Sequence, residues 1–504
     1  MEPPAAAGPQ SLQQRALVPV LVFLGMLVAV ISSLGAPLVP TIAAQDHVSP
    51  GDAQWSLTVT LLVGTVATPV MGRLGDGPSR RRMILGALVA VLAGSVLAAL
   101  PLGFGCLVTG RALQGLGLGL TPLAIATARD ALPPERSRPT VALLSVTTVA
   151  GVGLGYPITG LIAQSLGLHA GFWFGAAVCA LALVAAALVL PPAPRRTAAP
   201  LDMPGALLLG AALAGLLLAL SEAEVWGWAS VRLLVLAGLS LLLLGAWVAQ
   251  QLRTAHPLVD LRLTRNRTVL TADVTALVAG AGMYLLMTLV TRLVQTPRDT
   301  GYGFGASVVV TGLVLLPFSA ASAVAGRVAP LVVRRTSSAL VLASGCAVSL
   351  VAALAFAVGH DRLWQLFAVM GVAGFGVGCL FAVMPALITG SVPAHETGSA
   401  MSFNQVLRYA GYSAGSVLSA TVLQAHTPAG ASVPTGGGYR AAALLSCGVW
   451  AAMILVTLVL PRALRTAAPV PDAVPSRTAG PVTGTGTGTQ SVGGPGTERR
   501  EAVR

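Results

Sequence analysis

Runs of about twenty apolar residues follow one another along almost the whole chain, and they restrict it to one kind of fold. In hydrocarbon every backbone amide needs a partner within the protein, so such runs cross a bilayer as helices. The first run lacks a small-residue cleavage site and is followed by others, so we expect it to remain as a span. The sequence therefore predicts an all-α integral membrane protein with about 14 transmembrane helices.

Charge is scarce and lies mostly in the loops. Only 9% of the 504 residues are charged and 55% are hydrophobic, which leaves too little polar surface for a soluble protein of this length. Every cationic side chain is an arginine, and most arginines stand between apolar runs. The net charge of +13 therefore favours a lipid surface and not a nucleic acid. The five cysteines lie inside apolar runs without ligand or redox spacing, so neither a metal site nor a cofactor is expected.

The arginines alternate between successive loops. One set of loops is rich in arginine, and the other set carries only Arg232, Arg292, Arg298, Arg362 and Arg440. Because cationic loops resist translocation, the rich set is expected on the cytoplasmic side. This orientation predicts a multi-pass protein of the cell (inner or plasma) membrane, with both termini in the cytoplasm.

The chain also repeats itself. Gly72 and Arg73 recur as Gly326 and Arg327, 254 residues later. Parallel repeats in an apolar chain are typical of secondary transporters, whose halves move about a central site. A second set of matches, at an offset of 259, joins Gly115, Gly117 and Gly119 to Gly374, Gly376 and Gly378.

Six spans with their loops need only about 200 residues, so the longer offset leaves room for two inserted helices. The predicted organisation is a cytoplasmic N-terminus (1–15), a six-helix bundle (16–192), two inserted helices (193–255), a second six-helix bundle (256–462) and a tail (463–504). The tail is rich in Pro, Gly and Thr without periodicity, which predicts a disordered cytoplasmic segment. Since the repeat lies within one chain, a monomer is expected.

The loop between the second and third runs carries a family signature. It resembles the Gly-x-Leu-Ala-Asp-Arg-x-Gly-Arg-Arg-Arg motif of the major facilitator superfamily, and the chain is similar to the fourteen-span drug:proton antiporter branch of that family. The resemblance implies that Asp76 faces a helix start near Gly398 and Ser399, where the helix dipole stabilises a carboxylate by about 0.3–1 kcal/mol. This contact would stabilise one conformation of the transporter as a latch. Alternatively, the arginines of the loop only set the orientation of the spans in the membrane. The matching residues are Gly72, Leu74, Gly75, Asp76, Arg80, Arg81 and Arg82.

Span four carries Arg111 and Gln114, similar to the Arg-x-x-Gln-Gly signature of the branch. An arginine in hydrocarbon is costly unless it faces a wet cavity or a partner. The resemblance implies that Arg111 helps to couple proton movement to substrate movement and that Gln114 lines the substrate cavity. The alternative is an arginine neutralised by backbone carbonyls, which only holds helices together.

Span five resembles the antiporter signature Gly-x-x-x-Gly-Pro-x-x-Gly-Gly, with a displaced proline. Within the superfamily that signature accompanies exporters, so the resemblance favours efflux over uptake. Small residues also let helices approach closely, and physical chemistry without the resemblance favours this packing role. The residues concerned are Gly151, Gly155, Pro157 and Gly160, with Tyr156 expected to line the cavity.

Span thirteen contains Asn404, Gln405 and Arg408, which resemble an Asn-Gln-x-x-Arg run of the branch. They span just over one helical turn, so at least two of them can face a polar cavity, or they form an interhelical hydrogen-bond cluster. Asp273 in span nine is the one acid within an apolar run. It is either the protonation site or a residue at headgroup level. Two buried arginines against one acid favour neutral or anionic amphiphiles as substrates.

These observations predict a secondary active transporter that exports drug-like or secondary-metabolite molecules, coupled to protons, by alternating access. Its partners are a small-molecule substrate, protons and the lipid bilayer. A proton-coupled uptake symporter and a transport-inactive sensor or scaffold are the alternatives. No cluster of His, Ser or Cys reaches a common depth and no phosphate-binding loop is present, so an enzyme is not expected.

Overall fold

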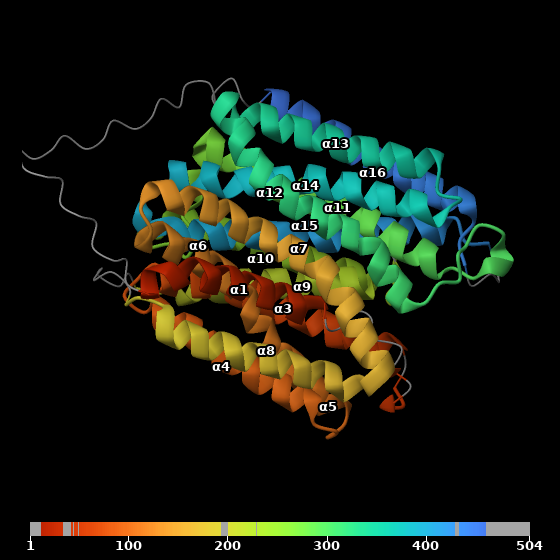
Figure 1. The fold of residues 1–504 in the computed structure, drawn as a ribbon, viewed down its shortest axis with the longest axis horizontal. Coiled ribbons are helices and arrows are strands. Elements are labelled where there is room, and N and C mark those ends of the chain that lie inside the picture. Colours follow the sequence, from red (N-terminus) through yellow and green to blue (C-terminus); the bar gives the residue numbers. More distant parts are fainter. Residues whose placement is uncertain are drawn as a thin grey trace, which may run out of the picture. The chain divides into compact units, whose positions relative to one another are not determined.

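The computed structural model describes residues 12–33, 42–43, 45–48, 50–192, 200–227, 229–428 and 433–459. Throughout these residues the secondary structure is helical, and the predicted all-α membrane fold is confirmed (Figure 1). Ten helices of the described part are long and apolar enough to cross a membrane, so the count of fourteen spans stays a prediction. The predicted tail and most of the predicted N-terminal segment lie outside the described residues.

The N-terminal set of helices precedes residue 190. Arg80 opens the third of its helices, and two turns that require a left-handed glycine, Gly103 (φ 91°) and Gly167 (φ 88°), lead into later ones. The set consists of α1 (Leu12–Ser33), α3 (Pro50–Gly75), α4 (Arg80–Ala99), α5 (Phe104–Gly115), η2 (Leu116–Gly119), α6 (Leu120–Ala131), α7 (Pro134–Leu166) and α8 (Leu168–Val189).

Two further helices, α9 (Met203–Trp226) and α10 (Val231–Arg253), lead to the C-terminal set. Polar side chains start several helices here, as the Asn266 carboxamide does by accepting the Thr268 amide at 2.9 Å. The C-terminal set consists of η3 (Leu261–Arg265), α11 (Arg267–Gln295), η4 (Arg298–Thr300), α12 (Val308–Arg335), α13 (Ser338–Val358), α14 (Leu363–Ser391), η5 (Ala394–Glu396), α15 (Thr397–Ala425) and α16 (Gly436–Val459).

Both sets contain the same kind of close helix crossing. A Cβ on Gly94 of α4 would lie 2.5 Å from the Gly110 carbonyl oxygen of α5. A Cβ on Gly345 of α13 would lie 2.9 Å from the Gly376 carbonyl oxygen of α14. Small residues allow backbones to approach this closely, so both sets use glycine to bring neighbouring helices together.

The fourth predicted span is interrupted. The sequence predicts one helix over about 103–127, whereas α5 ends at Gly115 and the chain passes through the 3-10 turn η2 before α6 begins. At this point α5 lies against α3, since a Cβ on Gly115 would be 2.5 Å from the Thr60 carbonyl oxygen. A 3-10 segment inside a helix often marks strain or a functional hinge.

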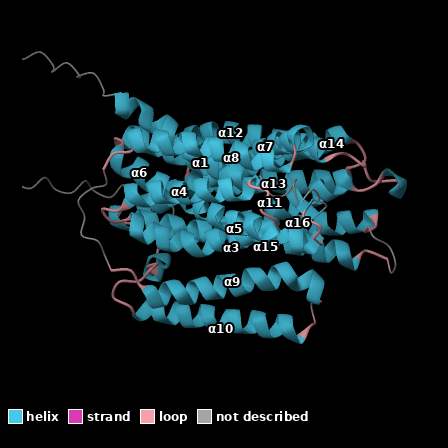
Figure 2. Cartoon of the chain, turned by 90° about the horizontal axis from the view of Figure 1, so that it is seen from below, coloured by secondary structure: helices cyan, strands magenta, loops and turns pink. Residues whose placement is uncertain are grey.

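The two sets meet along two seams. At the first seam α3 packs against α15, and at the second α7 packs against α12. The second seam is tight along its length: a Cβ on Gly312 would lie 2.8 Å from the Pro157 nitrogen, and one on Gly326 would lie 3.1 Å from the Val146 side chain. The pair α9 and α10 lies beside α3 and α15, outside the first seam (Figure 2).

Candidate functional site

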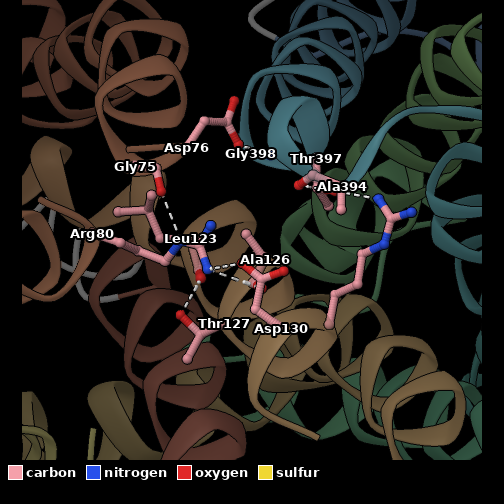
Figure 3. A network of polar contacts seen from close by, with 11 residues as sticks. Gly75, Asp76, Arg80, Leu123, Ala126, Thr127, Asp130, Ala394, Thr397 and Gly398 are labelled. Carbon is pink, nitrogen blue, oxygen red and sulfur yellow. Dashed lines mark hydrogen bonds and ion pairs between the residues drawn. The ribbon is translucent and has the colours of Figure 1, made fainter. Parts of the chain in front are cut away.

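The loop between α3 and α4 binds the start of α15. The Asp76 carboxylate accepts hydrogen bonds from the backbone amides of Gly398 (2.6 Å) and Ser399 (2.9 Å), and it is only 6% exposed. These amides belong to the first turn of α15, where the helix has no internal acceptors for them. Burial raises the pKa of the Asp76 carboxyl to about 6, although the two amides and Arg80 act in the opposite direction. Figure 3 shows Asp76 directed at Gly398.

Arg80 fixes this loop to α6. Its Nε donates to the Gly75 carbonyl oxygen at 2.7 Å. Its Nη1 donates to the Ala126 carbonyl oxygen at 3.1 Å and forms an ion pair with Asp130 at 2.6 Å (Figure 3). With Arg80 only 3% exposed, these partners replace the water that a buried guanidinium needs. Arg81, the next residue, binds the Ala187 carbonyl oxygen at the end of α8 (2.7 Å).

A second contact between the sets lies next to the first. Arg129 at the end of α6 donates to the Thr397 hydroxyl and to the Val392 carbonyl oxygen, the latter at 3.1 Å. We call this end of the bundle, which contains Arg80, Arg81 and Arg129, the arginine-rich end. Neither Arg129 nor Asp130 is assigned to a contact in the sequence analysis, although two opposite charges directly after an apolar run indicate polar contacts there.

The glycines of the loop make the approach of α3 to α15 steric as well as polar. A Cβ on Gly72 would lie 2.7 Å from the Gly398 carbonyl oxygen and 2.6 Å from the Ser402 Cβ. A Cβ on Gly75 would run into the Leu123 side chain of α6. These positions therefore leave no room for a side chain.

Arg111 lies in a cluster within the N-terminal set. It is 1% exposed and donates to the carbonyl oxygens of Ile31 (3.1 Å) and Ser56 (3.0 Å) and to the Gln114 side chain (2.6 Å). Gln114 in turn donates to the Ser95 hydroxyl (2.9 Å). The cluster joins α1, α3, α4 and α5, and all these partners of the guanidinium are neutral.

The glycine-rich part of α7 lies between two helices. A Cβ on Gly151 would run into the Ala29 Cβ of α1, and one on Gly160 would contact Val309 of α12 at 3.6 Å. Gly155 is buried, and Pro157 lies inside α7 without interrupting it. The Tyr156 side chain lies outside the described part, so its predicted place in a cavity is untested.

The third cluster joins α11 and α15. Asn404 donates to the Asp273 carboxylate (2.9 Å) and to the Ala272 carbonyl oxygen (3.2 Å), and Gln405 donates to the Tyr409 hydroxyl (2.8 Å). Asp273 is 4% exposed, so its carboxylate is buried within the protein, and its depth in the membrane stays a prediction. One turn later, Arg408 places its guanidinium 4.2 Å from the centre of the Phe381 ring of α14.

The structure therefore groups the predicted residues differently from the sequence. Arg111 and Gln114 are joined to each other, and Asn404 is joined to Asp273. None of the described contacts links Arg111 to Asp273, the two residues predicted as candidates for proton coupling. No group of metal-binding side chains occurs among the described residues.

Comparisons with known proteins agree with this architecture. A sequence model of the Major Facilitator Superfamily matches residues 21–416 and 272–493. An uncharacterized MFS-type transporter of Mycobacterium tuberculosis is 30% identical over 406 residues, covering 78% of this chain and 57% of that protein. The chain thus matches little more than half the length of this relative.

Two relatives carry functional names. The multidrug resistance protein Stp of Mycobacterium tuberculosis is 28% identical over 381 residues (74% of this chain, 68% of that protein). The tetracenomycin C resistance and export protein of Streptomyces glaucescens is 26% identical over 408 residues (78% and 73%).

A solved structure gives the same fold. The human organic anion transporter MFSD10 (TETRAN) superposes with a TM-score of 0.62 and 18% identity, over 91% of this chain and all of that chain. At that identity the likeness concerns the fold alone. From the helical architecture and the family match over most of its length, the chain belongs to the major facilitator superfamily and is a multi-pass membrane protein.

Proposed function

We propose that the chain exports drug-like or secondary-metabolite small molecules, driven by protons, through alternating access. The observation that carries this proposal is the contact of Asp76 with the first turn of α15, because it joins the two sets of helices through a few reversible hydrogen bonds. Six helices, two inserted helices and six helices, inserted as a monomer with both termini in the cytoplasm, form the proposed architecture. The arginine-rich end is then the cytoplasmic end.

In this proposal the contacts of Asp76 and Arg129 keep the cytoplasmic end closed while the opposite end releases substrate. Their hydrogen bonds contribute about 0.5–3 kcal/mol each, which is small enough for binding events to break them. Opening the cytoplasmic end requires α3 to leave α15. The 3-10 turn η2, between α5 and α6, would absorb part of this movement.

Asp273 is the residue we assign to the proton, and Arg111 is assigned to coupling. Ionisable residues within membrane helices are costly and mark ion pathways as a rule. Asp273 is buried, and its described partner is the neutral Asn404. Arg111 holds three N-terminal helices together through neutral partners, so a change in its contacts would move those helices jointly.

The direction of transport is supported by the names of two relatives. One is named for multidrug resistance and the other for resistance and export. The glycine pattern of α7 resembles that of exporters in the superfamily. Drug-like and secondary-metabolite compounds are therefore the substrates to test first.

The test uses everted membrane vesicles from an efflux-deficient bacterium that expresses the chain, energised to an acidic interior. Ethidium, Hoechst 33342 and tetracycline are offered in turn, and acridine orange reports the proton gradient. We expect at least one compound to enter the vesicles and to dissipate the gradient. A protonophore and Asp273→Asn should both abolish this, whereas Arg440→Gln, at an exposed site, should not. Uptake that persists with the protonophore refutes proton drive, and substrate movement only in the opposite direction refutes export.

A further inference from the structure

Arg408 is a buried cation with unsatisfied hydrogen-bond donors. It is 1% exposed, and its Nε and Nη1 have no hydrogen-bond partner. Leaving hydrogen-bond donors of a buried charged group without acceptors destabilises the fold. Arg111, buried to the same degree, contrasts with it because Arg111 donates to three acceptors.

No described acidic side chain forms an ion pair with Arg408. The buried carboxylate on the neighbouring α11, Asp273, accepts a hydrogen bond from Asn404 instead. The guanidinium therefore keeps a full positive charge and free donors in a part of the protein from which water is largely excluded. An anionic group from outside the chain would satisfy both.

The surroundings of Arg408 are aromatic. One face of the guanidinium lies over the Phe381 ring, which stabilises the cation and leaves its edges for hydrogen bonds. Tyr412 follows one turn later on α15 and stacks on Tyr284 of α11, with ring centres 4.3 Å apart. Tyr409 meets Tyr412 at 5.8 Å. An apolar ring system next to the charge would find flat aromatic surfaces here.

We propose that Arg408 binds the anionic group of the transported molecule, and that the substrates include amphiphilic aromatic carboxylates. The guanidinium would donate to the carboxylate through the free N–H groups, a geometry that lysine does not reproduce. The aromatic side chains of α11, α14 and α15 would contact the ring system. This assignment rests on the proposed export function and names a substrate class for it.

The binding test compares two probes that differ only in charge: 1-pyrenebutyrate and its neutral amide. Purified protein in phosphatidylcholine nanodiscs is titrated, and energy transfer from tryptophan to pyrene reports binding. We expect the wild type to bind the carboxylate about tenfold or more tightly than the amide. Arg408→Gln should bring that ratio near one, and the exposed control Arg440→Gln should keep it.

Arg408→Lys is a second variant, in case Arg408→Gln fails to fold. It keeps the positive charge but offers a single donor atom. It should retain a preference for the carboxylate that is weaker than that of the wild type. Equal binding of both probes by the wild type overturns the assignment, as does an unchanged ratio in a folded Arg408→Gln protein. Absence of binding by the folded wild type also counts against it.

A lipid headgroup carries an anionic group too. Nanodiscs with added phosphatidylglycerol separate the two sources: if this lipid displaces the carboxylate from the wild type but leaves Arg408→Gln unaffected, the site holds lipid and the substrate assignment is wrong. Transport separates the assignment from the proposed function. Export of ethidium without export of 1-pyrenebutyrate would overturn only the anionic substrate class.

Discussion

A methyl group at Gly72 should separate the two sets of helices at the arginine-rich end. In Gly72→Ala the new Cβ would lie 2.7 Å from the Gly398 carbonyl oxygen and 2.6 Å from the Ser402 Cβ. Because both are fixed parts of α15 and not the ends of flexible side chains, α15 itself must move. Forcing an extra methyl into a packed site costs about 1–3 kcal/mol, which shifts the equilibrium between joined and separated ends about 5-fold to 150-fold.

Gly86→Ala is the matched control. Gly86 lies in α4 at an exposed position, and a Cβ there meets no atom within 4 Å. Both substitutions exchange a helical glycine for alanine, so both gain the same helix propensity of about 1 kcal/mol. Any difference between the two variants therefore reports the contact with α15.

The measurement is a distance distribution between spin labels. Cysteines at Arg82 and His395, both exposed, place one label on each side of the contact, in a background with Cys106→Ser. The other four native cysteines are buried. We expect a longer and broader distribution in Gly72→Ala and an unchanged one in Gly86→Ala. Identical distributions in the two variants would refute the steric argument.

Two further predictions concern the charged groups. The pKa of Asp76 is about 6 in the joined state, against an ordinary value of 3.8, so the joined state binds the proton more readily. Acidification from pH 7 to pH 5 should therefore favour the joined state over the separated state about tenfold. This stabilisation should be lost again as the pH rises through 6. The distance between the same two spin labels measures this pH dependence. In Asp76→Asn the two ends should remain joined at every pH. A pH response that survives in this variant would assign the titration to another group. Arg111→Lys should lower the thermal unfolding temperature, because one ammonium cannot reach acceptors on α1, α3 and α5 together. The free energy of unfolding should fall by about 1–3 kcal/mol. The exposed Arg440→Lys should unfold like the wild type, and equal melting of both variants would mean that the carbonyl contacts of Arg111 contribute nothing.

The helical architecture was predictable because hydrocarbon allows few alternatives. Apolar runs of the right length become helices irrespective of their exact residues. The partner of Asp76 could be named in advance as well, from the family resemblance: the expected helix start near Gly398 and Ser399 is where the structure has the two hydrogen bonds. That these bonds act as a conformational latch stays a prediction.

What the sequence could not supply depends on residues far apart in the chain. Arg129 binds the carbonyl oxygen of Val392, and no local pattern around either residue indicates this partner. Likewise, only the folded packing separates Arg111, which donates to three neutral acceptors, from Arg408, which keeps free donors. In the sequence the two looked alike, as arginines inside apolar runs.

The inserted helices make the two seams unequal. Asp202 at the start of α9 binds the side chains of Gln250 (2.9 Å) and Gln251 (2.7 Å) on α10, and the hairpin so formed packs against both α3 and α15 through Leu209 and Trp247. The hairpin therefore covers the outer side of the first seam. The second seam, between α7 and α12, has exposed leucines on its outer side, Leu161 and Leu313 among them. If the two sets of helices move as proposed, a hydrophobic molecule dissolved in the bilayer would therefore reach the gap between them from the side of α7 and α12.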